Sequence, residues 1–218
     1  MLISLWSVKG GAGTTVVAAS LSLILDRAGK SGALIVDLDG DVPAALGLPD
    51  PGDPGISGWL SAGAEVPVDA LGRLEVPVGR GGVSLLPRGT GALVAPERAE
   101  ALAAVLAADP RPVVVDCGMV TSSPASLAFA AASTHSLLVT RACYLSLRRA
   151  VTTPVQPSGI VLVNEPGRSL SRADVEQVVG APVRAEVAVD PAVARAVDAG
   201  VLASRLPRAL ERSLRYAA

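Results

Sequence analysis

The stretch that decides the fold is Leu2-Ile-Ser-Leu-Trp-Ser7, followed after Val8 by Lys9-Gly10-Gly11-Ala12-Gly13-Thr14-Thr15. The first run predicts a buried strand, and the apolar stripe after the glycines predicts a helix over 15–28. Glycines between a strand and a helix let the backbone approach an anion, and the helix dipole adds positive potential there. The stretch therefore predicts a phosphate-binding turn. The alternative is a glycine-rich turn that binds no ligand.

The rest of the chain alternates between strand and helix patterns. Apolar runs bounded by Gly, Pro or Asp are typical of strands buried on both faces of a parallel sheet. These runs cover 33–37, 83–87, 112–116, 136–140 and 159–163. Helical patterns cover 95–108, 144–153, 171–179 and 190–199. The alternation predicts an α/β fold with a mostly parallel sheet flanked by helices.

One segment departs from this alternation. Residues 50–82 are rich in Gly and Pro and carry one short helical pattern at 56–61. We interpret the segment as a surface excursion and not as a linker between domains, so the prediction is a single nucleotide-binding domain over 1–218.

Composition narrows the classes of function. The chain has 218 residues, of which 50% are apolar and 18% charged, and its net charge is −1. Such a chain buries a substantial core, and its charge favours neither nucleic acid nor an anionic membrane as the main partner. With two cysteines that form no CxxC pair, and one histidine, a zinc site and a disulfide framework are not expected. We expect Cys117 to be a small buried residue.

The sequence also bears on localisation. No basic residues precede the first apolar run, so a signal peptide is not expected. The uncharged window 117–140 is long enough to span a bilayer, but Pro124 and several Ser and Thr residues interrupt it. We expect this window to divide into a loop, an Ala-rich helix and a short strand. The prediction is a cytoplasmic protein, with peripheral membrane contact as an alternative.

The glycine turn differs from the usual phosphate-binding motif GxxxxGK[ST]. Aligned on Gly13, the sequence has Val8 at the first glycine and Thr14 at the lysine, and it keeps the final hydroxyl at Thr15. A lysine, Lys9, stands instead at the head of the loop. It is one of only two lysines among 19 basic residues.

This KGGxGTT loop resembles the deviant Walker A loop of the ParA/MinD family of ATPases. In that family a signature lysine at the position of Lys9 reaches the phosphates of the facing subunit in a dimer. Further stretches resemble the family in the same order along the chain. They are 33–39 with Asp37 and Asp39, 83–89, 113–118 with Asp116, 160–164 with Asn164, and 186–200 with Asp190 and Pro191.

The resemblance implies roles for these residues. Lys9 and Asp39 would be catalytic, with Asp39 orienting the attacking water. Thr15, Asp37 and Asp116 would form the magnesium site. The implied nucleotide contacts are Gly10, Gly11, Ala12, Gly13, Thr14, Thr15, Asn164, Asp190 and Pro191. From the residues alone, Asp37 and Asp116 could instead cap strand ends, and Asn164 could be a turn residue.

The resemblance also implies a function. ATP and Mg²⁺ would be the cofactors, and the protein would be a positioning or assembly switch that forms an ATP-dependent homodimer and engages a protein partner. Because Thr14 replaces the lysine that contacts the phosphates, we expect ATP binding with slow or absent hydrolysis, that is, at most a weak ATPase. The loop is most similar to the CpaE/TadZ-like branch, associated with Tad-type pilus assembly. The alternative is a non-enzymatic scaffold that lost nucleotide control.

The C-terminus offers a further surface. Arg205, Arg208, Arg212 and Arg215 surround Leu206, Leu210 and Leu214 at helical spacing. We favour a last helix that packs these leucines on the sheet. Membrane binding through an amphipathic helix and DNA binding through the arginines are the alternatives.

Overall fold

The computed structural model describes residues 1–29, 31–62, 68–93 and 96–217. Within these residues the strands are β1 (Leu2–Ser7), β2 (Ala33–Asp37), β3 (Val76–Pro77), β4 (Val83–Leu86), β5 (Val113–Met119), β6 (His135–Arg141), β7 (Gly159–Asn164) and β8 (Val183–Ala188). They form one sheet in the order β3-β4-β2-β5-β1-β6-β7-β8. Neighbouring strands are parallel except β3, which pairs antiparallel with β4. The predicted mostly parallel sheet is confirmed.

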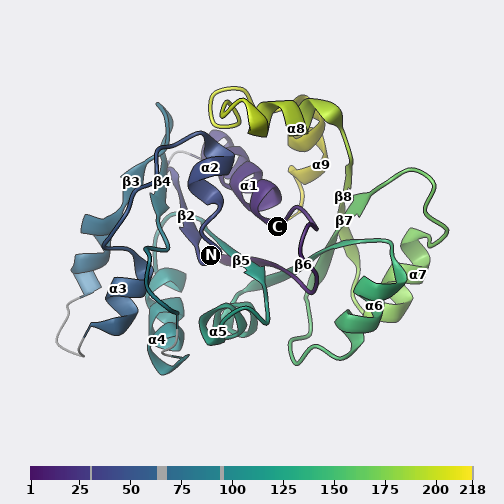
Figure 1. Ribbon diagram of the computed structural model, residues 1–218, viewed down its shortest axis with the longest axis horizontal. Coiled ribbons are helices and arrows are strands. Elements are labelled where there is room, and N and C mark those ends of the chain that lie inside the picture. Colours follow the sequence, from purple (N-terminus) through teal and green to yellow (C-terminus); the bar gives the residue numbers. More distant parts are fainter. Residues whose placement is uncertain (30, 63–67, 94–95, 218) are drawn as a thin grey trace.

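Helices cover both faces of the sheet (Figure 1). They are α1 (Thr14–Ala28), α2 (Val42–Leu46), α3 (Ile56–Ser61), a 3₁₀ helix (Val68–Leu74), α4 (Pro96–Ala107), α5 (Pro124–Ala132), α6 (Tyr144–Val151), α7 (Arg172–Val179), α8 (Pro191–Asp198) and α9 (Arg208–Leu214). One face carries α1, α2, α8 and α9, and the other carries α3 to α7. Parallel strands need such crossover helices, so the layered arrangement follows from the alternation in the sequence.

The predicted elements agree with the structure to within a few residues at their ends. The helix predicted at 95–108 is α4, and residue 95 lies outside the described residues. The start signal of α7 is a capping box, because Ser171 and Asp174 bond to each other's backbone N–H groups. The sequence analysis did not predict β3 or β8. β8 is an edge strand that alternates between buried and exposed residues, and so lacks the continuous apolar run of the central strands.

The interpretation of 50–82 as a surface excursion is wrong for α3 and for Leu71 of the 3₁₀ helix, whereas the turn over 79–82 is exposed, as that interpretation predicts. Ile56, Trp59 and Leu60 of α3 and Leu71 of the 3₁₀ helix are buried in the main apolar cluster. The Arg98 guanidinium of α4 lies 4.4 Å from the Trp59 ring centre. A Gly- and Pro-rich segment therefore completes the core beside β4. Residues 63–67 lie outside the described residues.

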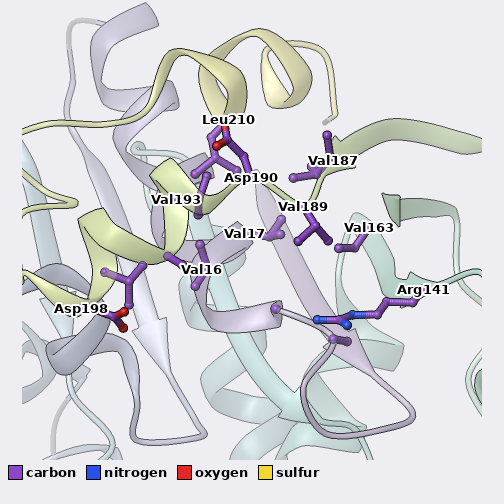
Figure 2. A pocket seen from close by; sticks show the side chains of 15 residues that line it. Val16, Val17, Arg141, Val163, Val187, Val189, Asp190, Val193, Asp198 and Leu210 are labelled. Atoms are coloured by element: carbon purple, nitrogen blue, oxygen red, sulfur yellow. The ribbon is translucent and has the colours of Figure 1, made fainter. Parts of the chain in front are cut away.

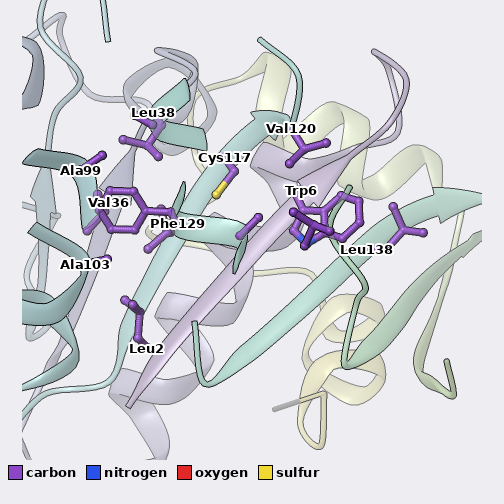
Figure 3. Close-up of a cluster of buried hydrophobic side chains, with 14 of the residues drawn as sticks. Leu2, Trp6, Val36, Leu38, Ala99, Ala103, Cys117, Val120, Phe129 and Leu138 are labelled. Atoms are coloured by element: carbon purple, nitrogen blue, oxygen red, sulfur yellow. The ribbon is translucent and has the colours of Figure 1, made fainter. Parts of the chain in front are cut away.

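The core between β1, β5 and α5 is built from large apolar side chains (Figure 3). Trp6 and Phe129 are fully buried, and Trp6 donates its indole N–H to the Ser136 hydroxyl at 2.9 Å. Cys117 is fully buried among them, as expected, and burial raises the pKa of its thiol well above the ordinary value. This core holds the carboxyl ends of β1 and β5 side by side.

The last helix, α9, packs Leu210 and Leu214 inward, as favoured, and Leu206 lies just before its first residue. Leu206, Leu210 and Leu214 are buried in the cluster beneath α1 and β8. The window 117–140 divides into the end of β5, the helix α5 and the strand β6. Within the described residues, every helix is too short or too polar to span a membrane.

Candidate functional site

The glycine turn lies at the carboxyl end of β1 and leads directly into α1. Gly11 and Gly13 have φ angles of 76° and 91°, a backbone region that other residues rarely adopt. A Cβ at either position would point into open space. The turn borders a cavity of about 360 Å³. The cavity is lined by residues 10–16 with Ser7, Asp39, Asp41, Gly118, Met119 and Ser122.

Asp37 and Asp116 meet at this edge of the sheet. They are paired in register across β2 and β5, and both are fully buried. Asp116 Oδ1 accepts the Gly118 N–H at 3.1 Å, but Asp116 Oδ2 is buried without a hydrogen-bond partner in the described structure. Burial, and after it the negative charge of Asp37, raises the pKa of Asp116 to about 7, although Thr15 opposes the rise. A buried oxygen without a donor is costly unless a ligand satisfies it.

Asp37 organises the turn that follows β2. Its Oδ1 accepts the N–H groups of Asp39 at 3.0 Å and Gly40 at 2.7 Å, and its Oδ2 accepts that of Val42 at 3.2 Å. Burial raises the pKa of Asp37 to about 6 in spite of these three bonds. The carboxylate therefore fixes the backbone that presents Asp39 to the cavity.

Asp39 lies against the backbone at the end of β5. It is exposed on the cavity wall, and a Cβ on Gly118 would lie 2.3 Å from its carboxyl carbon. Partial burial, then the charge of Asp41, raises the pKa of Asp39, whereas Arg88 lowers it. Gly118 also has a φ of 57°. The position of Asp39 thus depends on a glycine at 118.

We predict that Gly118→Ala displaces Asp39 and lowers the melting temperature, because the new methyl group collides with the carboxyl group and the backbone is strained. The expected loss of stability is about 1–3 kcal/mol, measured by denaturant unfolding. Gly10→Ala is the matched control, since its φ is not positive and a Cβ there meets nothing. Equal stability of the two variants would contradict this account of Gly118.

Thr14, at the position of the usual lysine, and Lys9, at the head of the loop, differ in exposure. Thr14 is 6% exposed and lines the cavity at the start of α1. Lys9 is exposed and is not among the residues that line this cavity. Its charge acts on Cys143, in the loop between β6 and α6. The Lys9 side chain is therefore exposed and close enough to Cys143 for its charge to act there, and it does not form part of the wall of this cavity.

A second, mostly apolar cavity of about 240 Å³ adjoins the first at the start of α1 (Figure 2). Both cavities are lined by Ala12, Gly13 and Val16. The walls of the second come from the glycine turn, α1, α8, α9 and the ends of β6, β7 and β8. They include Val17, Val163, Val187, Val189, Val193 and Leu210, with Arg141 as the one basic residue among the lining residues.

Of the three residues that the resemblance assigns to the base, only Asp190 lines the apolar cavity. Asp190 lines the apolar cavity, but its carboxylate caps α8 by accepting the Ala192 N–H at 2.8 Å. Pro191 is the first residue of α8 and Asn164 the last of β7, and neither lines the described cavity. Asn164 is exposed at the carboxyl edge of the sheet.

Several lining residues were not predicted as site residues. Arg141 ends a buried apolar strand with a charged side chain, as Asp37 does, and that signal could have identified it. Asp41 and Ser122 follow strands at the same edge, but their loops carry no motif. In the described part of the chain, no three His, Cys, Asp or Glu side chains cluster to hold a metal ion by themselves.

Comparison with known proteins places the fold. No family profile matches this sequence, and no curated protein sequence does. Solved structures match over nearly the whole chain. A ParA family ATPase from Chlorobium tepidum has a TM-score of 0.77 at 18% identity, covering 98% of this chain and 96% of that one. The chain has the ParA/MinD ATPase fold.

Two ligand-bound structures share the ParA/MinD fold. The septum site-determining protein MinD from Pyrococcus horikoshii, in complex with Mg-ADP, has a TM-score of 0.78 at 20% identity, covering 99% of this chain and 93% of that one. An ATP complex of a McdA variant from Cyanothece has a TM-score of 0.72 at 18% identity, covering 99% and 95% of the two chains. The likeness is to the fold, which positions a glycine turn and two acidic strand ends at one edge of the sheet.

Proposed function

We propose that residues 1–218 form one nucleotide-binding domain that binds Mg-ATP and acts as a ParA/MinD-type switch. The observation that carries this proposal is the fully buried Asp116 carboxylate beside Thr15 of the phosphate-binding turn, whose Oδ2 makes no close hydrogen bond within the described structure. In open α/β sheets, ligands bind at the carboxyl edge of the strands, where this oxygen lies.

The residues present fit a magnesium ion. Mg²⁺ prefers oxygen ligands and is held by one or two carboxylates together with water and substrate phosphates, and not by an all-protein cage. Asp116 and Thr15 supply oxygens beside the cavity, and the metal ion would supply positive charge to the phosphates there. We assign Asp37 to the surroundings of the metal, because both of its oxygens accept backbone N–H groups.

The two adjoining cavities fit a nucleotide. The turn over 10–15 and the start of α1 offer N–H groups and a positive helix end to phosphates. The apolar cavity suits a flat base, and small-molecule sites are typically apolar with a few polar groups. In this arrangement Asp190 lines the base cavity at the start of α8. Pro191 and Asn164 do not line it, and they would approach the base from the start of α8 and the end of β7. The MinD and McdA structures that share this fold contain adenine nucleotides.

Hydrolysis is expected to be slow or absent. Asp39 stands where a water could be oriented, but Thr14 supplies no charge where negative charge develops on the phosphates. The threonine at position 14 also favours a second candidate function, a non-enzymatic scaffold that kept the fold and lost nucleotide control. Within the first function, the KGGxGTT loop favours a CpaE/TadZ-like role in assembly or positioning.

Lys9 is assigned to contact between subunits. Because Lys9 is exposed and does not line the cavity of its own chain, its charge is available to the phosphates of a second copy. The dimer would then engage a protein partner. Among the structures that share this fold, MinD from Aquifex aeolicus was solved in complex with MinC.

Size-exclusion chromatography with light scattering tests this function. We expect the parent chain to shift from monomer to dimer when ATP and Mg²⁺ are added together, and Lys9→Ala to bind ATP but remain monomeric. Arg80→Ala is the control, because it also removes one exposed positive charge, but in the turn between β3 and β4. A constant mass for the parent chain would favour the scaffold.

A further inference from the structure

Arg141 is the basic residue that lines the apolar cavity. It is the last residue of β6, between β1 and β7, and its side chain points to the face of the sheet that carries α1. Figure 2 shows the side chain running from the end of β6 toward the first turn of α1, beneath Val163 and Val189. It lines the apolar cavity and not the phosphate cavity.

One edge of the Arg141 guanidinium is held in place. Its Nη1 lies 3.5 Å from a carboxylate oxygen of Glu165, the residue after β7, and Glu165 also pairs with Arg168. The Arg141 side chain is 36% exposed, but its Nε atom is buried and has no hydrogen-bond partner in the described structure. A charged donor left in this state beside an apolar cavity points to a ligand that completes its contacts.

The surroundings decide which part of a ligand Arg141 meets. Phosphates belong to the neighbouring cavity, where glycine N–H groups and the end of α1 receive them. The apolar cavity is lined mainly by valine side chains, with the guanidinium group of Arg141, and its acidic residues, Asp190 and Asp198, would repel phosphates. A guanidinium stacks well on aromatic planes and, having no acceptor, suits the acceptor nitrogens of a base.

We propose that Arg141 is a base-contacting residue whose guanidinium packs on the base of the bound nucleotide and so fixes the nucleoside half of the ligand. This inference rests on the proposed nucleotide function and adds a residue to it. Glu165 then acts as a positioning residue, because its carboxylate pairs with one nitrogen at the edge of the guanidinium group.

Isothermal titration calorimetry with two probes tests this role. Mg-ATP carries base and phosphates, whereas magnesium tripolyphosphate carries phosphates alone. We expect Arg141→Ala to weaken ATP binding about 5- to 30-fold, as for loss of a desolvated cation–π contact, and to weaken ADP binding by the same factor. Tripolyphosphate binding is expected to stay within about twofold of the parent.

Two further variants sharpen the test. Arg141→Lys keeps the charge but loses the plane, so it is expected to retain the fold and to lose a large part of the ATP affinity. Arg168→Ala is the matched control, because it removes the other arginine paired with Glu165 but does not line the cavity. Its ATP affinity is expected to equal that of the parent.

Three outcomes would overturn the inference. They are an unchanged ATP affinity in Arg141→Ala, an equal loss for ATP and tripolyphosphate, and full ATP affinity in Arg141→Lys. In each case the parent chain would still bind ATP, so the proposed function would stand. Absence of ATP binding to the parent would overturn both. Thermal melts of each variant, recorded without ligand, verify that the chain is folded.

Discussion

Asp116→Asn is expected to melt several degrees higher than the parent chain at pH 8 without ligand. In the folded chain the pKa of Asp116 is about 7, against an ordinary value of 3.8. The folded state therefore binds a proton that the unfolded state releases, and stability falls as pH rises between these two values. At pH 8 the folded state carries the full cost of a buried charge, and an amide removes it.

The size of this effect follows from the shift. Each pKa unit corresponds to about 1.4 kcal/mol, so the expected gain is on the order of 2–4 kcal/mol, or roughly 5–15 °C for a chain of this length. Differential scanning fluorimetry at pH 5.5 and pH 8 measures it. The parent should be more stable at pH 5.5, and the difference should shrink in the variant. Asp37, whose pKa is raised to about 6, contributes in the same direction and remains in both chains.

A matched control uses an acidic residue with the opposite shift. Asp174, in the capping box of α7, is exposed, and hydrogen bonds from Ser171 lower its pKa. Asp174→Asn should therefore destabilise the chain at pH 8, because the cap prefers a carboxylate. A lower melting temperature for Asp116→Asn than for the parent at pH 8 would show that the buried charge is compensated within the folded chain.

Thr14→Lys is expected to raise ATP hydrolysis by about 10²-fold or more. A lysine at this position would line the cavity at the start of α1 and place a charge beside the phosphates, where one such electrostatic contact is commonly worth 10²–10³ in rate. Asp39 and Asp116 are already in place in the parent chain. Phosphate release under saturating Mg-ATP measures the rate.

The control for this variant separates charge from bulk. Thr14→Met has a side chain of similar reach without charge and should hydrolyse ATP no faster than the parent. If Thr14→Lys and Thr14→Met have equal rates, the missing lysine does not limit hydrolysis. In that event the scaffold function becomes the better account, since restoring the phosphate contact restores no turnover.

The sequence carries most of the fold because its central strands are buried on both faces. Strands such as β1 and β2 are continuous apolar runs, and both were predicted with the bounds that the structure shows. The exceptions lie where burial is one-sided or local signals are weak. β8 alternates as an edge strand, and α3 packs Trp59 into the core from a Gly- and Pro-rich segment, which looks like a surface loop when only composition is considered.

The acidic residues of the candidate site were predictable because they lie at the carboxyl ends of strands. Asp37 and Asp116 follow apolar runs, and parallel strands bring such ends to one edge. The different hydrogen bonding of their oxygens could not be predicted. It depends on the turn that returns to Asp37, and on Asp116 Oδ2 having no hydrogen bond while Oδ1 accepts the Gly118 N–H. Arg141 was missed because its significance lies in the cavity formed with α8, about 50 residues further along the chain.

Calorimetric titration of ATP into the parent chain, with and without Mg²⁺, shows whether the chain binds Mg-ATP. The account predicts saturable binding of one ATP per chain that strengthens with Mg²⁺, and loss of that Mg²⁺ dependence in Asp116→Asn, which remains folded. No saturable binding in the parent, or the same Mg²⁺ dependence in both chains, would contradict it.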